Sequence, residues 1–321
     1  MFIKKIILVL IILAFSVGTI LFMYDSYDPL GRYNYDDEVI NKKIISKLNS
    51  DDLQYIVTYQ IDPYEFYRYL DAENFSIYHV KQYNKIIPQL FYLDLDKQVD
   101  FVEEMIKYDA NIDQVVDYLN SYNYTDLIYW YKYGDSYNDG SYLLKEPDYF
   151  DTYLDDNRTI SIKEPKNLVY LDDFGIELVK EPADQLLSMC QAMDLNLETS
   201  GCGYLNFTSG YISYNEQKEI YENALKKDSN SAILEFDLPG HSENQLGFAF
   251  DLLVSENLYT SDAYNWLVSN SYKFGYIQSL TEESASYTNK LARLNHFRYV
   301  GLDVSLYMHE TGKSFKEVSN G

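Results

Sequence analysis

The stretch PGHSENQLGFAFD, Pro239 to Asp251, decides the fold. Its first half combines proline and glycine with short polar residues, which is typical of a turn. From Gly247 to Val254 the chain becomes an apolar run, which suits a buried strand. The stretch therefore predicts a turn that leads into a strand inside a folded core.

Short strands and helices are predicted on both sides of this stretch. Ser261 has the side chain of a helix N-cap, and Gly275 suits the end of that helix. The further predicted segments are a strand at Thr159 to Ile162, a helix at Glu181 to Met193, and a strand at His296 to Val300 that leads into a final helix. This order predicts an α+β domain over residues 151–321.

The preceding region, 38–134, is predicted to be all-α, with a helical-hairpin repeat offset by 49 positions. The residues that recur in register are Tyr59, Tyr69, Leu70 and Asn74 as Tyr108, Tyr118, Leu119 and Asn123. Helix caps recur too, with Asp62 matching Asn111 and Ser76 matching Thr125. Linkers are predicted at 25–37 and 135–150. The repeats act either as a spacer or as a docking surface of an envelope scaffold.

Residues 1–24 resemble a topogenic signal. Lys4 and Lys5 precede an apolar run from Ile6 to Met23, and acidic residues follow it. This pattern predicts a transmembrane signal anchor, a single pass through the plasma membrane, and an extracellular C-terminal domain. A cleaved signal peptide is the alternative.

Composition excludes one class of partner and leaves two questions open. With 26 basic and 50 acidic residues the formal net charge is -24, which argues against nucleic-acid binding. Cys190 and Cys202 are the only cysteines, and they form either a disulfide in an oxidising exterior or two free thiols. The 35 tyrosines indicate core and interface packing, with glycan stacking as the alternative.

Three segments, in this order, resemble VanY-type D-alanyl-D-alanine carboxypeptidases. They are SGYISYNEQ at Ser209–Gln217, PGHSENQLGFAFD at Pro239–Asp251 and NHFRYVG at Asn295–Gly301. The resemblance extends from about Asn167 to the C-terminus and implies the fold of that family. It also implies zinc as cofactor, because the family's enzymes are zinc peptidases that remove the terminal D-alanine from peptidoglycan stem peptides. Nothing in the resemblance explains the helical repeats.

The chain departs from the family pattern at its centre. The resemblance implies that Asp251 and His296 retain metal-ligand positions, while Asn244 stands in place of the first histidine ligand. Arg293 occupies the position of the catalytic glutamate, and Ile212 replaces the arginine that faces the developing oxyanion. Losing a ligand, the proton acceptor and the oxyanion stabiliser together predicts an inactive centre without zinc.

Two outcomes stay open for the retained pair: Asp251 and His296 pair with each other, or Asp251 pairs with Arg293. The predicted function is a non-catalytic envelope protein that binds a peptidoglycan peptide or a protein partner, with Arg293 available to a peptide carboxylate. The candidate binding residues are Ser209, Tyr211, Ser213, Tyr214, Gln217, Ser242 and Arg293. The alternatives are a zinc D,D-carboxypeptidase that trims stem peptides with substitute ligands, and a scaffold that acts through the repeats.

Overall fold

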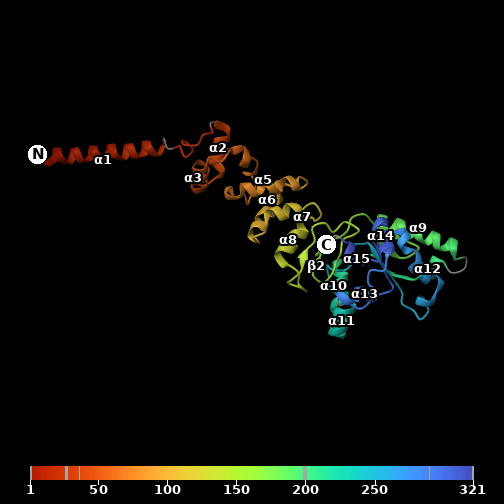
Figure 1. Cartoon of the computed structure of the whole chain (residues 1–321). Helices are drawn as coiled ribbons and strands as arrows, with labels where there is room; N and C mark the ends of the chain where they lie inside the picture. Colours follow the sequence, from red (N-terminus) through yellow and green to blue (C-terminus); the bar gives the residue numbers. More distant parts are fainter. Residues whose placement is uncertain (1, 26–27, 36, 198–200, 289, 320–321) are drawn as a thin grey trace. The chain divides into compact units, whose positions relative to one another are not determined.

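The computed structural model describes residues 2–25, 28–35, 37–197, 201–288 and 290–319. Its contacts divide the chain into two compact units, Met1–Lys107 and Tyr108–Gly321, coloured along the sequence in Figure 1. The division falls between Lys107 and Tyr108, inside the region predicted as helical repeats, so the second predicted repeat belongs to the unit that contains the sheet.

The first unit is helical throughout its described part. Its elements are α1 (Phe2–Asp25), α2 (Glu38–Lys47), α3 (Ser50–Tyr59), α4 (Pro63–Phe66), η1 (Tyr67–Tyr69), η2 (Ile77–His79), α5 (Val80–Ile86), η3 (Ile87–Leu90) and α6 (Leu95–Lys107). The Asp62 side chain accepts a hydrogen bond from the Tyr64 amide and caps α4, as predicted. Ser76 makes no side-chain cap, so that part of the predicted repeat is wrong.

The transmembrane anchor predicted over residues 1–24 is not supported. Helix α1 covers Phe2–Asp25, but no helix among the described residues combines the length and the apolarity needed to cross a membrane.

The second unit begins with two helices, α7 (Ile112–Tyr118) and α8 (Tyr124–Tyr133). Asn111 caps α7 as predicted, by accepting from the amides of Asp113 and Gln114. The cap of α8 is Asn123 rather than Thr125, and it forms a reciprocal capping box with Asp126. Thr125 lies inside the helix, where its side chain cannot serve as the cap.

A four-stranded antiparallel sheet positions the site, in the order β5 (Phe207–Ser209), β6 (Ala249–Leu252), β8 (His296–Tyr299) and β7 (Tyr276–Ile277). The smaller sheets are β1 (Tyr142–Leu143) with β2 (Arg158–Thr159) and β3 (Leu168–Leu171) with β4 (Ile176–Val179). The remaining helices are α9 (Lys180–Asn196), η4 (Cys202–Tyr204), α10 (Tyr214–Lys227), α11 (Ser229–Glu235), η5 (Leu258–Thr260), α12 (Asp262–Asn270), η6 (Ser271–Phe274), α13 (Glu282–Thr288), α14 (Leu302–Thr311) and α15 (Phe315–Val318). The predicted α+β class is confirmed.

One face of the sheet and helix α9 form the main core. Ala183, Leu186 and Met193 recur at helical spacing and are almost completely buried. From the sheet, Phe250 and Phe297 are paired across β6 and β8, with ring centroids 5.5 Å apart. Because side chains alternate along a strand, their neighbours Asp251 and His296 point to the opposite face.

Two further features bear on function. Cys190 in α9 and Cys202 in η4 are joined by a disulfide, with Cα atoms 5.1 Å apart.

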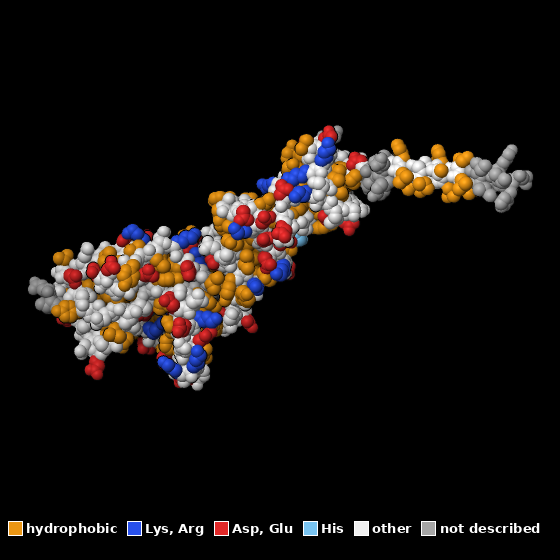
Figure 2. Space-filling model, turned by 180° about the vertical axis from the view of Figure 1, so that it is seen from behind, with side chains coloured by type: hydrophobic (Ala, Val, Ile, Leu, Met, Phe, Trp, Pro, Cys, Tyr) orange, Lys and Arg blue, Asp and Glu red, His pale blue; other side chains and the backbone are white. Residues whose placement is uncertain are grey.

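On the face shown in Figure 2, Lys and Arg side chains are interspersed with Asp and Glu. The surface seen there does not offer the clustered positive charge that a phosphate backbone attracts.

Candidate functional site

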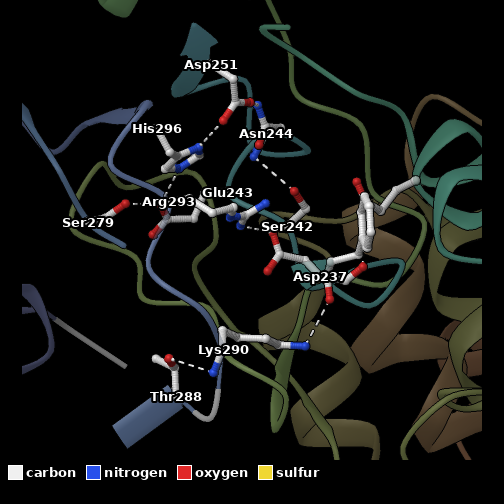
Figure 3. Close-up of polar contacts among 12 residues, drawn as sticks. Asp237, Ser242, Glu243, Asn244, Asp251, Ser279, Thr288, Lys290, Arg293 and His296 are labelled. Carbon is white, nitrogen blue, oxygen red and sulfur yellow. Dashed lines mark hydrogen bonds and ion pairs between the residues drawn. The ribbon is translucent and has the colours of Figure 1, made fainter. Parts of the chain in front are cut away.

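The site begins with three polar side chains on neighbouring strands. The sheet register pairs Ser209 with Asp251 and Asp251 with His296. Ser209 donates from Oγ to Asp251 Oδ2 at 2.5 Å. Asp251 Oδ1 lies 2.8 Å from His296 Nδ1, and Figure 3 shows these two side chains facing each other. Of the two pairings that the sequence left open for Asp251, the structure shows the one with His296.

The turn that precedes β6 carries the next two polar groups, Glu243 and Asn244. Gly240 and Gly247 adopt φ values of 89° and 73°, which L-residues with a side chain rarely adopt. Between them, the fully buried Gln245 accepts from the Gly240 amide and donates to the carbonyls of Ser161 and Lys163. These hydrogen bonds of Gln245 hold the turn together and tie it to the segment 161–163. The turn in this way positions Glu243 and Asn244 next to the sheet.

His296 lies between two carboxylates. Its Nε2 is 3.0 Å from Glu243 Oε2, while Nδ1 faces Asp251. Burial alone would lower the pKa of this imidazole, but the charges and hydrogen bonds of Asp251 and Glu243 outweigh burial and raise its pKa to about 9. His296 is therefore an imidazolium at neutral pH.

Glu243 is also held by a buried arginine. Arg298, two residues after His296 and on the same face of β8, donates from one guanidinium nitrogen to Glu243 Oε1 at 2.7 Å. Ser279 donates to the other oxygen at 2.5 Å. Burial would raise the pKa of the Glu243 carboxyl, but Arg298 and then His296 hold it far below its usual range. The carboxylate stays ionised inside the core.

Arg293 forms a further ion pair, with Asp237. Its guanidinium donates to Asp237 Oδ2 at 2.6 Å, as Figure 3 shows. The small cavity that Arg293 and Asp237 help to line measures about 30 Å³, which is room for water but not for a peptide. The centre thus contains three cationic and three anionic groups. Arg293 pairs with Asp237, Arg298 pairs with Glu243, and His296 lies between Glu243 and Asp251.

An open groove adjoins this centre on the side of β5. It measures about 600 Å³ and is lined by Ser209, Gly210, Tyr211 and Ile212, among others. Glu177, Glu216 and Glu219 also line it. Its volume lies in the range of ligand-binding pockets, so this groove is where a peptide has room to bind beside Asp251.

Comparison with known proteins identifies the domain built around this centre. A family model described as VanY, D-alanyl-D-alanine carboxypeptidase, matches residues 175–302. Residues 175–302 are a VanY-family domain. The matched range holds all four strands of the main sheet and the turn with Glu243 and Asn244.

Curated relatives and a solved structure agree with this assignment. The chain is 30% identical over 172 residues to a putative carboxypeptidase, YodJ, of Bacillus subtilis, covering 48% of this chain and 60% of the relative. It is 29% identical over 124 residues to a D-alanyl-D-alanine carboxypeptidase of Enterococcus faecalis, covering 35% of this chain and 46% of the relative. The solved LD-carboxypeptidase LdcB is 25% identical with a TM-score of 0.50, over 56% of this chain and 90% of that one. The chain thus spans less than two thirds of both curated relatives.

Zinc, the cofactor of the family, does not fit the donors that this VanY domain presents. Asn244 donates from Nδ2 to the Gly210 carbonyl at 3.0 Å and to Asp251 Oδ2 at 2.8 Å. Both of its neighbours are acceptors, so the amide must turn its N–H groups toward Asp251 and has no lone pair to offer there. Within the described ranges no three His, Cys, Asp or Glu side chains are grouped to hold a metal.

The predicted binding residues of the VanY domain divide into two groups. Ser209 and Tyr211 line the open groove, as does Ile212. The others have structural contacts: Ser213 caps α10, Tyr214 packs against the Tyr129 ring, Gln217 donates to the Asp237 carbonyl, and Ser242 accepts from the Asn244 amide. Arg293 is already paired with Asp237, so the carboxylate predicted for it is supplied by the chain itself.

Sequence reasoning missed Glu243, Arg298 and Asp237. Glu243 and Arg298 lie within the segments that resemble the family, but no role was predicted for either residue. An acidic residue in one of these segments and a basic residue in another are candidates for an ion pair, so the sequence does hold a signal for this contact. Asp237 and Ser279 lie outside all three segments and carry no such signal.

Proposed function

We propose that the VanY domain binds peptidoglycan stem peptides without hydrolysing them. The observation that carries the proposal is the centre in which the charges of the buried His296 and Arg298 and of the partly buried Arg293 are already matched by carboxylates. A divalent cation added there would leave positive charge uncompensated, which is costly inside a core. Without zinc, nothing at this centre activates water.

The peptide-binding part of the proposal rests on the groove and on the relatives. The groove is open, and Gly210 to Ile212 form part of its wall. Gly210 has no room for a side chain, because a Cβ there would meet the Glu177 carbonyl oxygen at 2.4 Å. The wall is therefore closely packed against Glu177 at this position, as expected of a preformed site. The Enterococcus faecalis relative is named for action on D-alanyl-D-alanine, which makes peptides with that end the first ligands to test.

We also propose that the domain works outside the cytoplasm. The Cys190–Cys202 disulfide supports this location, because such bonds persist in oxidising compartments and are rare in the cytosol. A stem-peptide ligand supports the same location, since the cell wall lies outside the plasma membrane.

Calorimetry on the full chain tests the proposal, with a synthetic stem pentapeptide that ends in D-Ala-D-Ala. We expect saturable binding, and mass spectrometry of the same samples should show intact peptide after prolonged incubation. Tyr211→Ala should weaken binding by roughly tenfold, because it removes a ring from the groove wall. Tyr204→Ala is the matched control, because Tyr204 is 68% exposed and does not line this groove.

Two results would contradict the proposal in different ways. Absence of binding would remove the recognition role. Release of D-alanine by the natural chain would instead support an active D,D-carboxypeptidase with substitute ligands.

A further inference from the structure

A second groove lies in the unit Tyr108–Gly321 but outside the VanY match. It consists of two hollows of about 550 and 530 Å³. Both are lined by Lys145, Glu146 and Tyr149, so they adjoin each other across these three side chains. The rest of the groove comes from helix α7, the turn after it and the segment 142–152. These elements belong to the part of the chain that the family resemblance leaves unexplained.

Ion pairs inside the groove neutralise much of its charge. Lys145 lies 2.8 Å from Asp117, and Asp148 lies 3.0 Å from Lys163. The carboxylates of Glu146 and Asp151 also line the groove and add negative charge, which disfavours a polyanionic ligand. What the groove mainly offers is therefore uncharged hydrogen-bonding groups and aromatic rings.

Two exposed tyrosine rings line the groove, and hydrogen bonds hold the backbone between them. Tyr142 and Tyr149 line the groove and are 47% and 60% exposed. The backbone between them is held from α7 and the turn after it, since the Tyr118 and Tyr122 hydroxyls donate to the carbonyls of Leu143 and Leu144 at 3.0 and 2.7 Å. An exposed ring on a rigid backbone loses little conformational entropy when a ligand packs against it.

Side-chain amide and hydroxyl groups also line the groove. Gln114 lines one hollow, and Asn120 and Ser121 line the other. Exposed tyrosine rings can pack on the C–H faces of sugars, and side-chain amides and hydroxyls match their hydroxyl and N-acetyl groups. We propose that this groove binds the N-acetylated glycan strand of peptidoglycan. This inference rests on the proposed function and extends it from the stem peptide to the sugar chain that carries the peptide.

One side chain connects the groove wall to the VanY centre. Arg298 donates to the carbonyls of Phe150 and Thr152, and with its other nitrogen to Glu243. Thr152 lines the glycan groove, and the next residue, Tyr153, lines the small cavity beside Arg293. The hydrogen bonds of Arg298 therefore hold the wall of the glycan groove against the VanY centre.

Binding of a peptide-free chitin tetrasaccharide to the full chain, measured by calorimetry, tests the inference. We expect saturable binding that falls by roughly tenfold or more in the Tyr142→Ala, Tyr149→Ala double variant. Tyr149→Phe keeps the ring and should retain most of the affinity. Tyr204→Ala, with a 68% exposed ring outside the groove, should bind as the natural chain does. Matching thermal unfolding curves establish that the double variant folds.

The D-Ala-D-Ala pentapeptide separates this inference from the proposed function. The double variant should bind that peptide with unchanged affinity. Failure of the natural chain to bind the tetrasaccharide, or equal binding by the double variant, overturns the glycan groove. Glycan binding without peptide binding would leave the groove standing and overturn the proposed function.

Discussion

The triple variant Asn244→His, Arg293→Glu, Ile212→Arg is expected to acquire zinc and to release D-alanine from a stem pentapeptide, whereas the natural chain releases none. The first change puts an imidazole where Asn244 now turns N–H groups toward Asp251. The second removes the guanidinium paired with Asp237 and restores a carboxylate at the position of the family's base. The third restores the family's arginine in the wall of the groove.

The expected gain in the rate of D-alanine release follows from what the restored base and the restored arginine each contribute to catalysis. A positioned acid or base typically contributes about 10²- to 10⁴-fold in rate, and an oxyanion donor about 10²- to 10³-fold. We therefore expect turnover only in the triple variant and zinc binding already in the Asn244→His, Arg293→Glu pair. Elemental analysis and a D-alanine release assay measure the two effects.

A matched control adds a histidine elsewhere. Asn206→His places the same side chain at an exposed position next to β5, and it should not increase bound zinc. Turnover by the natural chain equal to that of the triple variant would show that the replaced residues do not limit catalysis.

Arg298→Met is expected to cost about 3–5 kcal/mol of unfolding free energy. Arg298 is completely buried, and its removal leaves the Glu243 carboxylate without its nearest cation. The carbonyls of Phe150 and Thr152 lose their donor at the same time. Methionine fills much of the volume, so the cost comes from unpaired polar groups rather than from a cavity.

Urea denaturation of the full chain measures this loss. The control is Lys180→Met, because Lys180 pairs with Asp184 across a largely exposed surface and such pairs contribute only about 0–1 kcal/mol. Equal losses in the two variants would mean that the buried network does not stabilise the domain.

Patterns of apolar residues and caps were enough to predict much of the fold. Ser261 begins α12 and accepts from the Tyr264 amide, and Gly275 ends η6 with a φ of 81°. The predicted strand from Gly247 to Val254 forms as the shorter β6, and His296 begins β8. These signals are local, so they can be recognised in one sequence.

The arrangement of the centre could be predicted only in part. The pairing of Asp251 with His296 was one of two outcomes left open, and it follows from strand register. The ion pair of Arg293 with Asp237 joins residues 56 positions apart, and that of Arg298 with Glu243 joins residues 55 apart. His241, in the turn before β6, is buried as well, and its Nε2 lies 2.7 Å from Asp135 Oδ2, a contact between residues 106 positions apart. Such contacts depend on how distant segments pack, which no local pattern reveals.

The protonation state of His296 tests most directly whether an imidazolium between two carboxylates stands where the family holds a metal. Nitrogen-15 NMR of the imidazole can follow it from pH 6 to 10, with and without added zinc. The expected result is a ring that is doubly protonated at pH 7, loses its proton only near pH 9, and is unaffected by zinc. A ring that is neutral at pH 7, or one whose Nδ1 signal shifts on stoichiometric addition of zinc, would contradict the account.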